Sequence, residues 1–143
     1  MQTFLPYPDI DKSLDVLDYR RLGKQRVEAF QLLNVLLDRN TRKGWKNQPI
    51  CKMWRGYENA LKHYLNTSIK KWIERGYNNN MKLEDIKGEI IYPKWFGNKK
   101  FHSSHRSNLL RKDFDFYSKY GWTDNPDDPY QWFNSDTNSF YNI

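Results

Sequence analysis

The sequence predicts an all-α protein, a compact single-domain helical bundle with an extended N-terminal arm and an aromatic, turn-rich C-terminal tail. Three observations lead to this fold class. The chain has 143 residues, which is enough for one domain with a real core. Apolar residues recur at helical spacing in three separate stretches. Proline and glycine fall mostly between these stretches, where they interrupt helices. We therefore expect residues 1–143 to form one domain.

The expected N-terminal arm is the segment "MQTFLPYPDID", because its two prolines disfavour a helix. Ser13 is then a candidate cap for a short helix that runs through Leu14 and Leu17. Gly23 marks a bend or a close approach of the backbone to a neighbour.

The first long helix is expected from about Leu22 to Arg39, where residues follow one another at about 100° around the axis. Its apolar side consists of Leu22, Ala29, Phe30, Leu33, Leu36 and Leu37, and its polar side of Arg21, Lys24, Gln25 and Glu28. Arg26 projects from the apolar side, so we expect it to be half buried, with its head paired or reaching solvent.

The remaining elements follow from similar patterns. Pro49 suits a helix start, and a helical stripe then runs from Tyr57 to a stop at Gly76. A short helical piece is expected at 83–86, inside a segment rich in Asn, Gly and Pro. The last helix lies in "FHSSHRSNLLRKDFDFYSKYGW", capped by Ser103 or Ser104. The tail beyond it should wrap the body.

Charge predicts a polyanionic partner. The net charge is +7, and residues 1–112 carry 23 Lys and Arg against 11 Asp and Glu, whereas residues 113–143 carry one lysine against six aspartates. A basic body of this kind is typical of nucleic-acid binding, although solubility alone is the alternative. Aromatic residues make up 17% of the chain, and such residues fill cores or stack on exposed bases.

Several classes of protein are disfavoured. A lone Cys51 excludes an internal disulfide framework. The sequence shows neither a signal peptide nor an apolar stretch long enough to span a bilayer. We therefore expect a soluble, intracellular, cytoplasmic protein that does not bind membranes, and nothing in the sequence requires more than a monomer.

The motifs of P-loop, dinucleotide-binding and zinc proteins are missing. "HSSH" places His102 and His105 on one helix face, but two ligands without a clear third predict no metal site. We expect these histidines to contact phosphates, the opened strand or the reacting groups.

The run from Tyr19 to Arg26 gathers cations around one carboxylate, Glu28. A surface ion pair between Lys24 and Glu28, four residues apart, is the simple interpretation and contributes about 0.3–0.5 kcal/mol. The functional interpretation is that the cations hold phosphates while Glu28 stabilises a developing sugar cation. Cleavage of a glycosidic bond needs such a carboxylate, and it also needs a base removed from the stack.

Four strings, "MQTFLPYPD", "LDYRRLGKQRVEAFQLL", "MWRGYENAL" and "FHSSHRSNLLRKD", resemble the pyrimidine dimer DNA glycosylase/endonuclease V family, most closely its bacterial members. The resemblance runs from Met1 to about Trp132. It implies an all-helical enzyme that acts on damaged or modified duplex DNA, with neither metal nor cofactor. It also implies an α-amine nucleophile that forms a Schiff base at the sugar C1′, followed by strand cleavage.

A phage member of the family carries its essential glutamate in a Tyr-Arg-Glu-Leu-Pro-Arg string. Tyr19, Arg20 and Leu22 match that string, and Lys24 takes the place of its second arginine. Arg21 occupies the glutamate's own position, so Glu28 is the nearby carboxylate that replaces it. We expect DNA to be bound by Arg20, Arg21, Arg26, His102, His105, Arg106 and, by resemblance to the family's aromatic segment, by Tyr117, Tyr120 and Trp122.

The nucleophile departs from the family pattern as well. Gln2 is bulky, which disfavours removal of the first methionine, so the α-amine would belong to Met1. An α-amine titrates at about 8 and a lysine at about 10.4, and the unprotonated form attacks. Met1 is therefore preferred over Lys24, and attack by water is the third possibility. Two other functions stay open, a non-catalytic DNA- or RNA-binding module of this fold and a metal-dependent nuclease that uses the two histidines.

Overall fold

The structure is a computed structural model that describes residues 1–39 and 43–143. Its elements, in chain order, are α1 (Ile10–Asp15), α2 (Tyr19–Leu36), the 3-10 helix η1 (Lys43–Asn47), α3 (Pro49–Trp54), α4 (Glu58–Glu74), α5 (Lys99–Lys112), α6 (Phe114–Tyr117), the 3-10 helix η2 (Ser118–Tyr120), β1 (Gln131–Asn134) and β2 (Ser139–Asn142). The protein is thus mostly helical, as the sequence predicts, but the two strands show that it is not purely all-α.

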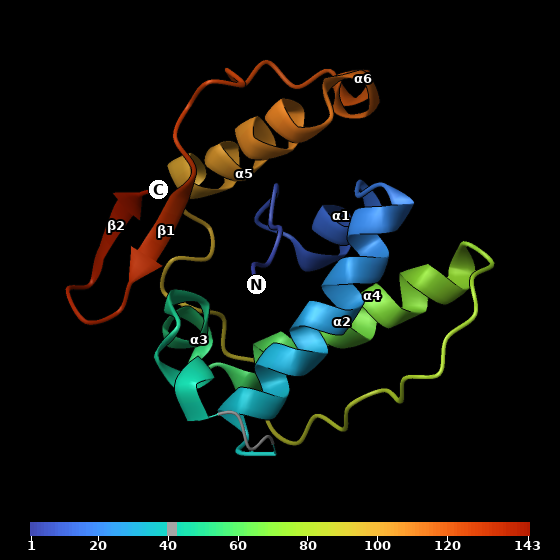
Figure 1. The fold of residues 1–143 in the computed structure, drawn as a ribbon, viewed down its shortest axis with the longest axis vertical. Helices are drawn as coiled ribbons and strands as arrows, with labels where there is room; N and C mark the ends of the chain where they lie inside the picture. Colours follow the sequence, from blue (N-terminus) through green and yellow to red (C-terminus); the bar gives the residue numbers. More distant parts are fainter. Residues whose placement is uncertain (40–42) are drawn as a thin grey trace.

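The two strands form an antiparallel hairpin inside the segment that the sequence predicts to be a turn-rich tail. Gln131 pairs with Asn142, and Asn134 pairs with Ser139. Aromatic residues on both strands favour extended backbone, and Asn138 takes the left-handed conformation (φ 53°) that a tight turn requires. Figure 1 shows the hairpin on the side of the molecule opposite α4.

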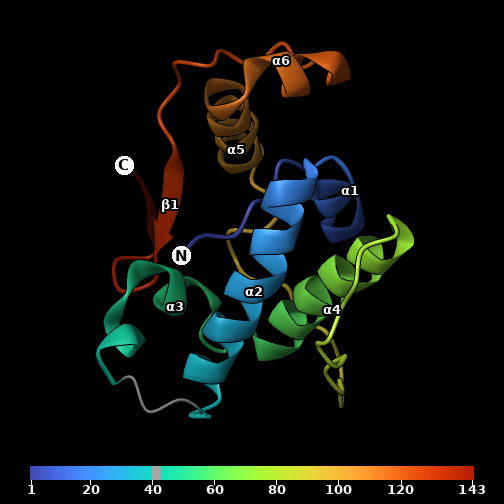
Figure 2. The ribbon, with the colours of Figure 1, turned by 45° about the vertical axis from the view of Figure 1, so that its right-hand side comes forward.

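Helices α2 and α4 cross at the centre of the fold, as Figures 1 and 2 show. Close contact near one end of the crossing requires a glycine. A Cβ at Gly23 would lie 2.8 Å from the Trp72 ring, which is shorter than any normal carbon–carbon contact. The expectation that Gly23 marks a close approach of the backbone is therefore confirmed, and α2 continues through it.

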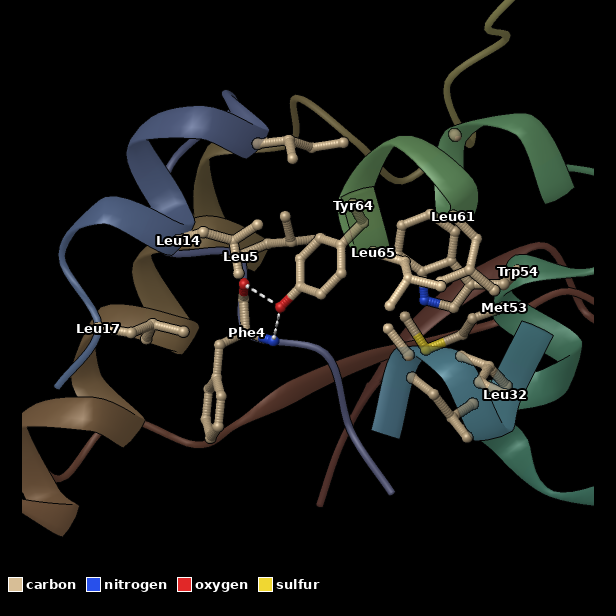
Figure 3. Close-up of a cluster of buried hydrophobic side chains, with 14 of the residues drawn as sticks. Phe4, Leu5, Leu14, Leu17, Leu32, Met53, Trp54, Leu61, Tyr64 and Leu65 are labelled. Atoms are coloured by element: carbon tan, nitrogen blue, oxygen red, sulfur yellow. Dashed lines mark hydrogen bonds between the residues drawn. The ribbon is translucent and has the colours of Figure 1, made fainter. Parts of the chain in front are cut away.

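The N-terminal arm runs through the interior, between α2 and α4 on one side and α5 and β1 on the other (Figures 1 and 2). Thr3, Phe4 and Leu5 are all buried. Figure 3 shows the Tyr64 hydroxyl between the backbone N–H and carbonyl of Phe4, at 3.0 Å from each. The arm is therefore part of the core.

The helix caps differ from those that the sequence suggested. Asp9, Asp18 and Asn98 accept hydrogen bonds from the first turns of α1, α2 and α5. Ser13 lies inside α1 instead, and its hydroxyl bonds the backbone of Tyr7 at 3.0 Å. The expected caps at Ser103 and Ser104 also lie inside a helix, because α5 begins four to five residues earlier.

The segment between α4 and α5 contains no helix at 83–86, which corrects that prediction. It is held in an extended path by side chains of α4, since Asn66 bonds the backbone of Glu84 through both its oxygen and its nitrogen. Leu83 is left 52% exposed, so the apolar pattern there has no core to face. Among the described residues, no helix has the length and apolar character needed to cross a membrane.

Candidate functional site

A hollow of about 400 Å³ opens beside the N-terminal turn of α2. Three of the predicted site cations, Arg20, Arg21 and Lys24, line it, and Lys112 at the end of α5 joins them. The other lining residues are Gln2, Phe4, Asp18 and Asp113. With four cations against two carboxylates, the hollow suits an anionic ligand such as a phosphate backbone.

The hollow's position is set by the start of α2. Asp18 caps that helix and accepts hydrogen bonds from the backbone N–H of Arg21 at 3.2 Å and from its guanidinium at 3.1 Å. It also accepts a hydrogen bond from the Tyr117 hydroxyl at 2.5 Å. Burial raises the pKa of Asp18, but these hydrogen bonds from Tyr117 and Arg21 outweigh it and lower the pKa overall. A charged Asp18 therefore holds Arg21 at the rim.

Arg20 is hydrogen-bonded to the first of three stacked aromatic rings. Its Nε donates to the Tyr19 hydroxyl at 3.0 Å. Tyr19 stacks on Tyr77 with ring centroids 5.9 Å apart, and Tyr77 stacks on Trp72 at 4.4 Å. Since Trp72 belongs to α4, this stack of rings connects the rim of the hollow to the second central helix.

Glu28 does not form the surface ion pair with Lys24 that the spacing suggested. Across residues 1–39 and 43–143, no salt bridge joins these two side chains. The carboxylate instead accepts a hydrogen bond from Gln25 Nε2 at 3.0 Å, and the same nitrogen donates to the backbone oxygen of Gln2 at 3.0 Å. Glu28 is thereby connected to the segment that bears Met1, which is itself half buried against the core.

His102 and His105 are buried, and both form hydrogen bonds with the backbone of Leu5. The Leu5 N–H donates to Nδ1 of His105 at 3.0 Å, and the Leu5 carbonyl lies 2.7 Å from Nδ1 of His102. Since the backbone N–H of Gly97 donates to Nε2 of His102 at 2.9 Å, the ring proton of His102 sits on Nδ1. Burial lowers the pKa of both rings. The two histidines therefore anchor the arm to α5, and their contacts with DNA stay a prediction.

Arg106 and the aromatic candidates also form contacts within the protein. Arg106 donates to Asp124 at 2.8 Å and to the Pro6 carbonyl at 2.7 Å. The three aromatic residues of "YSKYGW" pack together and hydrogen-bond to the N-terminal arm and to the segment between α1 and α2. Tyr117 is fully buried, Tyr120 donates to the Val16 carbonyl at 2.9 Å, and Trp122 donates to the Tyr7 hydroxyl at 2.7 Å. None of the four lines the hollow.

Arg26 lies on the side of α2 that faces α4. Its guanidinium is 4.8 Å from the centroid of the Trp72 ring and donates to Asn79 at 2.5 Å. Burial lowers the pKa of Arg26. The expected half-buried position is confirmed, and this cation is not part of the hollow.

Sequence reasoning missed Lys112 and Gln25. Lys112 lies 88 positions beyond Lys24 in the numbering, and only the fold brings the two together. Gln25 was expected on the polar side of its helix, but its side chain is fully buried. The only signal for it was its place one turn before Glu28, which puts i and i+3 side chains side by side.

The described residues include no group of three or more His, Cys, Asp or Glu side chains that could hold a metal ion. The two histidines of "HSSH" have their Nδ1 atoms occupied by the backbone of Leu5. The donor set of the site consists of amide, carboxylate and cationic groups.

The sequence profile described as pyrimidine dimer DNA glycosylase matches residues 1–85, which is more than half of the chain. Those residues contain the arm, α1 to α4, the cations of α2 and Glu28. A comparison with curated proteins and one with solved structures found no match. The fold and its cationic hollow define a protein suited to an anionic partner, and the profile match identifies its family. The chain belongs to the pyrimidine dimer DNA glycosylase family.

Proposed function

We propose that this protein is a DNA glycosylase that excises a damaged or modified base, such as a pyrimidine dimer, from duplex DNA. The hollow's cations, Arg20, Arg21, Lys24 and Lys112, bind the phosphate backbone. Glu28 faces the sugar. The observation that carries the proposal is the hydrogen-bonded path from Glu28 through Gln25 to the backbone of Gln2, because it joins a carboxylate to the segment that carries an amine.

In the reaction, the lone pair of the Met1 amine forms a bond to C1′ while the bond between C1′ and the base nitrogen breaks. The electron pair of that bond leaves with the base. Glu28 stabilises the sugar cation that develops and accepts the proton that the amine loses. Opening of the sugar ring then gives a Schiff base, from which β-elimination of the 3′ phosphate cleaves the strand.

Met1 is the preferred nucleophile because the side-chain amide of Gln25 hydrogen-bonds both Glu28 and the backbone of Gln2, the residue that follows Met1. Lys24 lines the hollow without any ion pair to Glu28 in the described part of the chain, so it suits phosphate binding better. If water attacks in place of an amine, Glu28 acts as its base, and the enzyme releases the base without forming a Schiff base.

Borohydride trapping tests the proposal. The protein is offered labelled duplexes that are undamaged, ultraviolet-irradiated or abasic, and peptide mapping locates any adduct. An adduct at Met1 supports amine attack there, and one at Lys24 moves the nucleophile to that residue. Free base without an adduct supports the hydrolytic route. Tight binding with neither product identifies a non-catalytic DNA-binding module of the same fold, which the arginine at position 21 favours.

The matched variants are Glu28→Gln and Glu74→Gln. A glutamine at position 28 keeps an oxygen that accepts from Gln25, so the fold should persist. Loss of the carboxylate should reduce product formation by about 10²- to 10⁴-fold while the Kd for DNA stays the same. Glu74 is exposed at the end of α4, and its variant should behave like the unmodified protein. Equal activity of the two variants would remove Glu28 from the mechanism.

A further inference from the structure

Gln25 is a fully buried side chain with every hydrogen-bonding position filled. Its Nε2 donates to the Gln2 carbonyl and to Glu28, both at 3.0 Å. Its Oε1 accepts from the backbone N–H of Phe4 at 2.9 Å, and the Tyr64 hydroxyl shares its one proton between this oxygen and the Phe4 carbonyl. A glutamine amide offers two donors and two acceptor lone pairs, so none is left over.

The orientation of this amide is fixed by the backbone on either side. The Phe4 N–H can only donate, so the Gln25 oxygen must face it. The Gln2 carbonyl can only accept, so the Gln25 nitrogen must face that side. Both partners impose the same orientation, and a flipped amide would place two donors or two acceptors against each other. The second N–H of Gln25 is therefore directed at Glu28.

We propose that Gln25 is a positioning residue of the active site, which holds the Glu28 carboxylate in a fixed position relative to the backbone of residues 2–4. The proposal rests on the glycosylase function proposed above. Rigid orientation of reacting groups accounts for a large share of an enzyme's rate, and small displacements are costly.

A neutral amide suits this role better than a cation would. A lysine or arginine partner would neutralise the charge of Glu28, and this charge is what a developing sugar cation requires. Gln25 orients the carboxylate without neutralising its charge. The Tyr64 hydroxyl, from α4, lies within hydrogen-bond distance of the oxygen at the opposite end of the amide.

Two variants separate orientation of Glu28 from general support of the fold. Gln25→Glu keeps both acceptor contacts, to Phe4 and Tyr64, but replaces the donor to Gln2 and Glu28 with an oxygen. Tyr64→Phe removes one partner of the same amide without touching Glu28. Both are compared with the unmodified protein on the substrate that it cleaves. Thermal unfolding and circular dichroism at each pH give the folded fraction to which rates are normalised.

At pH 7.5 we expect Gln25→Glu to lower kcat by roughly 10- to 100-fold, with the Kd for DNA unchanged, because two carboxylates now face each other. As the pH falls to 5.5, a proton shared by the pair restores a donor toward Glu28, so the ratio of wild-type to variant kcat should shrink several-fold. Tyr64→Phe should keep kcat within about threefold and show a constant ratio across this range.

If Gln25→Glu does not fold at neutral pH, Gln25→Met takes its place in the test, because methionine removes the donor without adding charge. It should also lower kcat with the Kd unchanged. The inference is overturned if the Gln25 variants keep wild-type kcat, or if Tyr64→Phe loses as much activity as they do with the same pH profile. If the unmodified protein releases no base and forms no adduct on any duplex, the proposed function itself fails, and this role for Gln25 fails with it.

Discussion

Acidification should weaken the fold through His105, the buried ring that binds the N–H of Leu5. An unprotonated Nδ1 accepts this bond, and burial, with help from nearby His102 and Arg106, holds the pKa of His105 well below its usual value. Folding therefore requires the neutral ring. In the unfolded chain the same ring titrates at about 6.5.

The sign and size of the effect follow from this difference. Between the lowered pKa of the folded state and 6.5, the unfolded chain binds more protons, so the free energy of unfolding falls as the pH falls. The stability is fully present above about pH 6.5 and is lost progressively below it. If His105 stays neutral in the folded protein, the loss between pH 7 and pH 5 is about 2 kcal/mol from this ring alone. His102, whose pKa is also lowered by burial, adds to the loss in the same direction.

Urea unfolding followed by tryptophan fluorescence at pH 7, 6 and 5 measures this dependence. His105→Gln is less stable at pH 7 because it disturbs a buried contact, but its stability should fall by about 2 kcal/mol less than that of the wild type on going to pH 5. An identical pH dependence in the two proteins would refute the reasoning, since His105 would then take up its proton in the folded state. The bond from Leu5 to an unprotonated ring would not exist.

Two further predictions concern packing and charge. Gly23→Ala places a methyl group 2.8 Å from the Trp72 ring, and we expect it to cost about 1–3 kcal/mol of unfolding free energy in the same urea assay. Lys112→Ala should lower the slope of log K against log salt for DNA binding by about one unit, as loss of one phosphate contact does. Lys87→Ala is the matched control, because its side chain is 89% exposed and lies outside the hollow, and its slope should equal that of the wild type.

The central helices could be predicted from the sequence because their packing follows a local pattern. Apolar spacing located α2 and α4, and Gly23 was correctly expected at a close approach. The helix start at Pro49 is confirmed, whereas the caps of α1 and α5 were missed because serines compete with aspartates and asparagines as caps. The hairpin carried a signal, in the form of aromatic runs on either side of residues 135–138, but a pattern of four residues per strand is too short to outweigh a helical majority.

The candidate site was predicted only in part, because most of it is assembled by contacts far apart in the chain. The helical wheel placed Arg21, Lys24 and Glu28 on one side of α2, and the hollow does include the first two. The same wheel put Gln25 on a solvated face. The arm covers that face, and no periodicity within α2 can show where residues 2–5 will lie. The positions of the two histidines could not be predicted for the same reason, since their hydrogen-bond partner is the backbone of Leu5.

The arm explains why so many polar side chains are buried in a protein of this size. The backbone of residues 2–5 forms no helix and no sheet, so each of its buried polar groups needs a partner. Gln25 from α2, Tyr64 from α4 and the two histidines of α5 supply these partners. Three helices thus contact the backbone of the arm, and Glu28 is hydrogen-bonded to the same network. Removal of any one of these side chains therefore leaves a buried polar group of the arm without its partner, which we expect to cost about 1–3 kcal/mol of unfolding free energy.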